Sequence, residues 1–167
     1  MAEAKIGDEF VTHEFDEAIA VQRAIVNAET ALAKSHPHAQ SKVVIKSALK
    51  ADQTFLTQLE RLGKPKGATG KVEDVAEGLT ELLASTVEKA GEAESEAYEA
   101  HAVLLNAKRK QQDSAGGMLA IARALKDTEM RDAAQAFAKG QKSSSNELAD
   151  QLADFAVVIA TQGASTQ

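Results

Sequence analysis

Apolar residues recur at helical spacing along most of the chain, and this periodicity constrains the fold more than any other feature. In four long stretches an apolar side chain returns every third or fourth residue, which places these side chains on one face of an α-helix. Alanine, glutamate, lysine, glutamine and leucine dominate the sequence, and β-branched residues never form an alternating run. We therefore predict an all-α fold.

Breaks in the pattern divide the chain into helices. Pro37 ends the first stretch, because the residue before a proline is driven out of the α region. Ser35 can then cap a second helix that carries Pro37 in its first turn and stops at Gly63. Residues 63–71, with three glycines and a proline, predict a loop. The expected helices of this single domain, residues 1–167, cover residues 9–34, 37–62, 72–90, 92–125 and 128–162.

The third expected helix determines how the others connect. At 1.5 Å per residue, its roughly 18 residues span about 27 Å, close to the length of the long helices. It can carry the chain from one end of the molecule to the other, so that the second and third long helices run parallel. Four long helices with one such crossover make the ferritin-like arrangement. The apolar pattern keeps its register through Gly116 and Gly117, which predicts one continuous helix with a soft point there.

Composition and charge exclude several classes of protein. The chain has no cysteine, which excludes a disulfide scaffold, a thiolate metal site and a cysteine nucleophile. A formal net charge of −6 disfavours binding to nucleic acid or to an anionic membrane. No apolar run approaches the roughly 20 residues of a membrane span, and residues 1–10 lack the apolar core of a secretory signal, so we expect a cytoplasmic protein. Because 33 of the 167 residues are alanine, the core contains few large apolar side chains. We expect a homodimer, which would bury additional apolar surface.

Each long helix interrupts its apolar face near the middle with a polar residue. Gln22 lies 14 residues before the first hairpin turn, near residue 36, and Asp52 lies 16 residues after it. Gln111 and Gln141 each lie 15 residues from the second turn, near residue 126. Antiparallel helices place such positions at the same height, and residues one turn away join the same layer. The predicted buried polar layer consists of Gln22, Asp52, Lys108, Gln111, Gln141 and Ser144.

Three segments resemble the YciE/YciF family of ferritin-like stress proteins. The segments are F-L-T-Q-L-E-R-L-G at 55–63, L-A-I-A-R-A-L-K-D-T-E at 119–129 and G-Q-K-S-S-S-N-E-L-A-D-Q-L at 140–152. They are similar to the ends of that family's second, third and fourth helices. The resemblance implies a four-helix bundle with a diiron centre at the height of the polar layer, held by carboxylates and Glu-x-x-His or Glu-x-x-Glu pairs.

The chain departs from this family at the implied ligand positions. Gln22 stands where the family has a glutamate, residues 108–111 (K-R-K-Q) stand where it has Glu-x-x-Glu, and residues 140–141 (G-Q) replace an acidic pair. Asp52 is then the one carboxylate left in the predicted layer. Iron and manganese sites need several anionic oxygen or imidazole ligands, and one aspartate with amides does not supply them. The pattern therefore predicts a layer without a metal.

Lys108 has two interpretations at the height of this layer. Its ammonium can take the place of the metal, between Asp52 and the amide oxygens of Gln22, Gln111 and Gln141, which gives a buried charge a charged partner and hydrogen bonds. Alternatively, the lysine extends to the surface and the glutamines lie at the boundary of the core.

Three functional interpretations follow. We favour a non-catalytic ferritin-like protein with a stress-associated or interaction role, without a diiron centre, a catalytic residue or a cofactor. In the second interpretation the ligands lie elsewhere, and a ferroxidase-type protein binds iron or manganese through Glu29, Asp52, Glu94 and His101. The third is a helical adaptor unrelated to ferritins.

The histidines add little to these interpretations. Glu94 and His101 are two turns apart, about 10 Å along one helix, so one ion cannot bridge them. We expect His101 in the core or at its boundary. His36 and His38 flank Pro37 at a hairpin turn, where we expect both to be solvated.

Overall fold

The chain forms five α-helices and one short 3-10 helix. The structure, a computed structural model, describes residues 2–162, and describes the side chains of residues 6–73 and 75–162. No strand occurs within these residues, so the prediction of an all-α fold is confirmed. None of the described helices is long and apolar enough to cross a membrane. The elements are α1 (Ala2–Ser35), α2 (Ala39–Gly63), η1 (Lys64–Lys66), α3 (Asp74–Lys89), α4 (Glu94–Leu125) and α5 (Thr128–Thr161).

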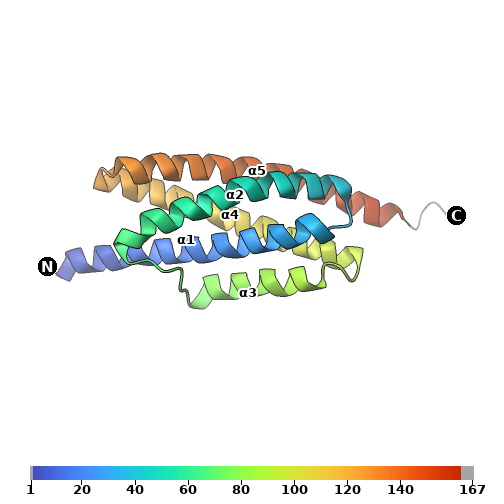
Figure 1. The fold of residues 1–167 in the computed structure, drawn as a ribbon, viewed down its shortest axis with the longest axis horizontal. Coiled ribbons are helices and arrows are strands. Elements are labelled where there is room, and N and C mark those ends of the chain that lie inside the picture. The colour runs from blue at the N-terminus through green and yellow to red at the C-terminus, as the bar shows by residue number, and fades with distance from the viewer. Residues whose placement is uncertain (1, 163–167) are drawn as a thin grey trace.

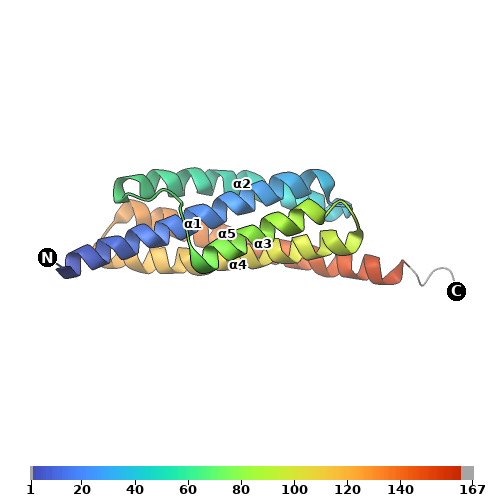
Figure 2. The same ribbon diagram turned by 90° about the horizontal axis from the view of Figure 1, so that it is seen from below.

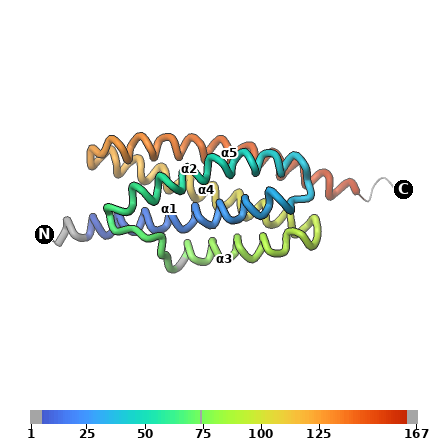
Figure 3. Tube along the Cα trace, in the orientation of Figure 1, coloured from blue at the N-terminus to red at the C-terminus, as the bar shows by residue number. Residues whose placement is uncertain are grey.

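The four long helices lie side by side, and the shorter α3 lies outside them (Figures 1 and 2). Helix α1 packs against α2 and α4, and α5 packs against the same two helices. Asp52 and Phe55 of α2 contact Gln141 and Phe137 of α5 in reverse order, so these two helices are antiparallel. Helix α3 packs against α1 and α4 and carries the chain back along the molecule, so that α2 and α4 run in the same direction (Figure 3).

The apolar core consists of two clusters with polar residues between them. With the exception of Val21, which lies directly before Gln22, the buried residues of the two clusters lie on opposite sides of residues 22, 52, 108–111 or 141 along each long helix. Ile25, Leu32, Ile45, Leu104, Leu148 and Phe155 are large members of the first cluster. Phe15, Ile19, Leu59, Met118, Met130 and Phe137 are large members of the second. The four helices therefore meet at one polar level in the middle of the molecule.

The helix ends near Pro37 differ from those expected. Ser35 is the last residue of α1 and not the cap of α2, because its hydroxyl donates to the Ala31 carbonyl within α1 at 3.1 Å. Pro37 lies before α2 and not in its first turn, and His38 is the N-cap residue. Helix α1 also begins at Ala2, seven residues earlier than expected.

Two glycine sites differ in what surrounds them. Helix α4 continues through Gly116 and Gly117 without a break, as the apolar pattern predicts, and a Cβ at Gly116 would meet nothing within 4 Å. Gly140 in α5 lies against the Phe55 ring of α2, and a Cβ there would come within 2.6 Å of Cζ. Gly140 therefore permits the close contact between α2 and α5.

Replacing these glycines by alanine should give opposite effects. Gly140→Ala should lower the free energy of unfolding by about 1–3 kcal/mol, because the Phe55 ring must move. Gly116→Ala, the matched control, should raise it by about 1 kcal/mol through helix propensity. Urea denaturation measures both, and equal effects at the two sites would show that the contact with Phe55 does not determine the result.

Candidate functional site

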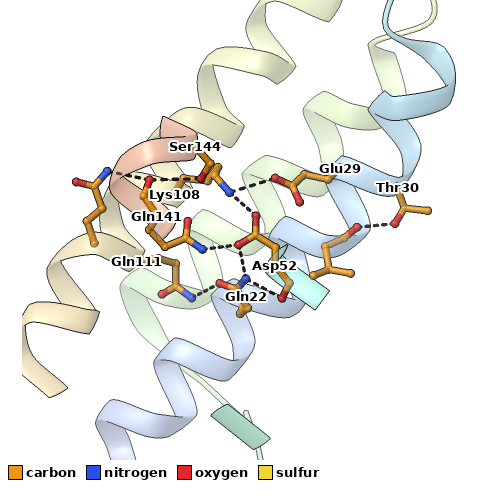
Figure 4. A network of polar contacts seen from close by, with 10 residues as sticks. Gln22, Glu29, Thr30, Asp52, Lys108, Gln111, Gln141 and Ser144 are labelled. Carbon is orange, nitrogen blue, oxygen red and sulfur yellow. Dashed lines mark hydrogen bonds and ion pairs between the residues drawn. The ribbon is translucent and has the colours of Figure 1, made fainter. Parts of the chain in front are cut away.

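A buried cluster centred on Lys108 joins all four long helices at the polar level (Figure 4). Lys108 of α4 has no exposed surface, and its ammonium contacts the buried carboxyl groups of Asp52 and Glu29. Nζ donates to Asp52 Oδ2 of α2 and, at 3.2 Å, to Glu29 Oε1 of α1. Because a buried ammonium is costly without an anionic partner, this contact ties α4 to both helices of the first hairpin.

Three glutamines complete the cluster around Asp52. Gln22 Nε2 of α1 donates to Asp52 Oδ1 at 2.8 Å, and Gln141 Nε2 of α5 donates to the same oxygen. Gln111 Nε2 of α4 donates to Gln22 Oε1 and to the Ala18 carbonyl, both at 2.9 Å. Asp52 therefore receives donors from one lysine and two amides, an arrangement that suits an ionised carboxylate.

Glu29 is held differently from Asp52. It accepts from Lys108 alone among the described side chains, and its Oε2 has no hydrogen-bond partner there. Burial raises the pKa of Glu29 well above its ordinary value of 4.5, and the negative charge of Asp52 adds to this rise, although Lys108 opposes it. With Glu29 protonated, the cluster contains one ammonium and one carboxylate and is neutral overall.

The structure brings together five of the six side chains expected in the layer: Gln22, Asp52, Lys108, Gln111 and Gln141. Ser144 lies outside this cluster, because it is half-buried and donates to the backbone carbonyl of Gln141 at 3.4 Å. The neighbouring Ser145 is the buried serine of α5.

Two expectations about Lys108 need correction. Its ammonium does not bond to the amide oxygens, because Gln22 and Gln141 turn their NH₂ groups toward Asp52, whose oxygens need donors. The alternative, in which the lysine reaches the surface, is also wrong, because Lys108 is fully buried. Its second partner, Glu29, was not expected in the layer, although it lies seven residues after Gln22, two turns along the same face of α1.

The alternative metal ligands do not lie together. Glu29 and Asp52 share Lys108, whereas Glu94 accepts from Gln162 Nε2 at 2.9 Å and His101 contacts His36. Within the part of the chain that the structure describes, no three His, Cys, Asp or Glu residues are placed to hold a metal ion. The set Glu29, Asp52, Glu94 and His101 is therefore not a binding site in this structure.

The residues at the polar level do not fit the diiron centre that a ferritin-like resemblance implies. The Lys108 ammonium bridges Glu29 and Asp52, the two carboxylates of the cluster. A cation beside it would meet direct repulsion, and the amides nearest to Asp52 present donors and not oxygen ligands. No metal chemistry can be assigned to this donor set.

A second buried polar group lies nearer the turn between α1 and α2. His36 is fully buried and not solvated as expected, because its ring packs against Phe155 of α5 with a centroid distance of 4.9 Å. His36 Nε2 lies 3.3 Å from His101 Nδ1, and His101 Nε2 lies 2.9 Å from the Leu148 carbonyl. The ring of the half-buried His38 also stacks on Phe155, with a centroid distance of 5.4 Å and an angle of 17° between the rings.

Comparisons with known proteins give no family for the chain. No protein-family model matches it, and no curated protein matches its sequence. A function must therefore be inferred from the buried side chains and their contacts.

Glu29→Gln should test the protonation of the cluster. A neutral glutamine replaces a neutral acid, so the free energy of unfolding at pH 5 should stay within about 1 kcal/mol of that of the unchanged protein. Because the pKa of Glu29 is raised on folding, its contribution to stability is present below pH 4.5 and is lost as pH rises through the folded-state value. The variant should therefore gain stability relative to the unchanged protein between pH 5 and pH 9.

Urea denaturation across this pH range measures the difference, and Glu99→Gln on the exposed face of α4 serves as the matched control. A glutamine variant that is less stable by more than about 2 kcal/mol at every pH would mean that Glu29 is ionised in the folded protein.

Proposed function

We propose that this protein is a non-catalytic ferritin-like four-helix bundle in which an ammonium–carboxylate cluster takes the place of a diiron centre. The arrangement of α1, α2, α4 and α5 supports the bundle, since neighbouring helices are antiparallel and α3 connects α2 to α4 along the outside. The resemblance of three segments to the YciE/YciF family supports the same fold.

One observation carries the proposal: Lys108 is buried at mid-height and pairs with Asp52. In ferritin-like proteins the carboxylates at this height balance the charge of the metal ions. Here the ammonium supplies that positive charge, and the glutamines satisfy the remaining oxygens of Asp52. The cluster therefore stabilises the bundle without a ligand that could take part in redox chemistry.

A stress-associated or interaction role, as a homodimer, fits a bundle of this kind. Several large apolar side chains remain exposed on it, among them Ile6, Phe10, Val75 and Leu82. Exposed apolar side chains provide surface for association with a second copy or another protein. The function then depends on the shape and surface of the bundle and not on a reaction inside it.

Metal analysis and Fe(II) titration test this proposal. Protein purified without chelator should contain far less than one equivalent of iron or manganese, and added Fe(II) should neither bind in stoichiometric amount nor oxidise faster than in buffer. A matched control carries Gln22→Glu, Lys108→Glu, Gln111→Glu and Gln141→Glu, which provides carboxylates at the cluster positions, and this variant should gain metal binding. Two equivalents of bound iron with oxidation in the unchanged protein would overturn the proposal.

A further inference from the structure

The proposed function does not use the buried histidines His36 and His101, which hold the turn between α1 and α2 in place. His36 follows the last residue of α1, and His38 is the N-cap residue of α2, so the two rings belong to the turn itself. His36 contacts His101 of α4, and both rings of the turn pack against Phe155 of α5. We propose that the His36–His101 pair is an acid-sensitive contact whose protonation releases this turn from α4 and α5.

The hydrogen bonds determine which ring nitrogens carry protons. The Leu148 carbonyl can only accept, so His101 Nε2 must carry a proton to donate to it. In a neutral ring His101 Nδ1 is then an acceptor, and His36 Nε2 donates to it. His36 Nδ1 in turn accepts from the backbone N–H of His38 at 3.1 Å. All four ring nitrogens of the pair therefore take part in hydrogen bonds. Each ring accepts at Nδ1 and donates from Nε2, so the donors point from the His38 backbone through His36 and His101 to Leu148.

An additional proton has no place in this chain of bonds. On His101 it would enter Nδ1 and face the N–H of His36. On His36 it would enter Nδ1 and face the backbone N–H of His38. If His36 changed its tautomer to accept from a protonated His101, its own proton would lie on Nδ1 and face the backbone N–H of His38. Either event sets two donors against each other and adds a charge among buried rings.

The surroundings of the pair do not offset such a charge. Protonated His101, His38 and Lys42 of α2 would each repel a charge on His36, and His38 would repel a charge on His101. Helix α5 contributes the Leu148 carbonyl and the Phe155 ring, neither of which titrates. Among the described residues, no carboxylate forms a hydrogen bond or ion pair with either ring. Burial is the main cause that lowers the pKa of both histidines from 6.5 to about 4, although the bond to the Leu148 carbonyl opposes it for His101.

The direction of the pH effect follows from these values. Between pH 6.5 and pH 4 the unfolded or opened turn binds protons that the folded turn excludes, so stability at this site falls as pH falls. Glu29 has the opposite dependence, because burial raises its pKa and acid keeps it in the neutral form that the folded cluster holds. Lys108 lies seven residues from His101, about 10 Å along α4. Mild acid should therefore open the end of the molecule at the turn while the cluster at mid-height stays closed.

The first test compares the unchanged protein with His36→Gln/His101→Gln, which keeps a donor and an acceptor at each position and removes both titrations. His13→Gln, at an exposed histidine beside Glu17, is the matched control. Between pH 6 and pH 5 the unfolding constant of the unchanged protein and of the control should rise roughly 50-fold more than that of the double variant. Equal pH dependence in the folded double variant and the unchanged protein would overturn the proposal.

A second measurement uses the unchanged protein alone and so does not depend on whether the variant folds. Nitrogen-15 NMR of the imidazoles should show His36 and His101 as neutral Nε2–H rings down to pH 5. The protection factors of the amides in residues 36–42, which correct for the intrinsic pH dependence of exchange, should fall in acid before those in residues 104–111. Titration of either ring near pH 6.5 would overturn the proposal, and so would an equal loss of protection at both segments. These readouts involve no metal, so their failure is distinct from a failure of the proposed function.

Discussion

The ion pair between Lys108 and Asp52 is the interaction on which the rest of the structure depends. A lysine ammonium with no exposed surface loses its hydration, and this cost is offset only if an anion and further hydrogen bonds replace the water. Asp52 supplies the anion, and Gln22 and Gln141 hold that carboxylate from two other helices. One charged contact therefore fixes the height at which all four long helices meet, and sliding any helix by a turn would separate the charges.

The seven-residue spacing on α1 and α4 places the polar groups on a common seam. Gln22 and Glu29 follow one another at this spacing on α1, and His36 comes seven residues later, directly after the end of that helix. His101 and Lys108 have the same spacing on α4. Because the two helices are antiparallel, Glu29 meets Lys108 and His36 meets His101. The two polar contacts lie two turns apart, with apolar residues such as Leu104 between them. Sliding α1 along α4 would break each of these contacts and leave buried polar groups without partners. Apolar packing alone tolerates such a shift more readily.

Helical spacing was sufficient to predict much of this fold. The apolar pattern predicts the all-α class, the continuous α4 and the mid-height positions of Gln22, Asp52, Gln111 and Gln141, because the period of a helix fixes which residues share a face. It could not predict the orientation of the amides or the inclusion of Glu29, since both depend on where the Lys108 ammonium lies in three dimensions. The sequence therefore indicated Glu29 as a candidate metal ligand, whereas in the structure its carboxyl group contacts Lys108.

The histidines show a different limit of local sequence signals. Pro37 correctly indicates a turn, and turns usually lie in solvent. The burial of His36 comes from Phe155 and His101, which are distant in sequence, so no local pattern could reveal it. In the same way, the hydroxyl of Ser35 looked like a cap for α2, yet α1 continues far enough to bind it internally. A tertiary contact decides the first case, and a local hydrogen bond within α1 decides the second.

A double-mutant cycle between Lys108 and Asp52 is the most direct test that this ion pair organises the molecule. It is best measured by urea denaturation in a Glu29→Gln background, so that Asp52 is the one carboxyl group that contacts the lysine. Lys108→Met and Asp52→Asn should each cost about 3–5 kcal/mol, because each strands a buried charge. The double variant should recover at least about 2 kcal/mol of their summed cost. Losses that add to within about 0.5 kcal/mol would contradict the account.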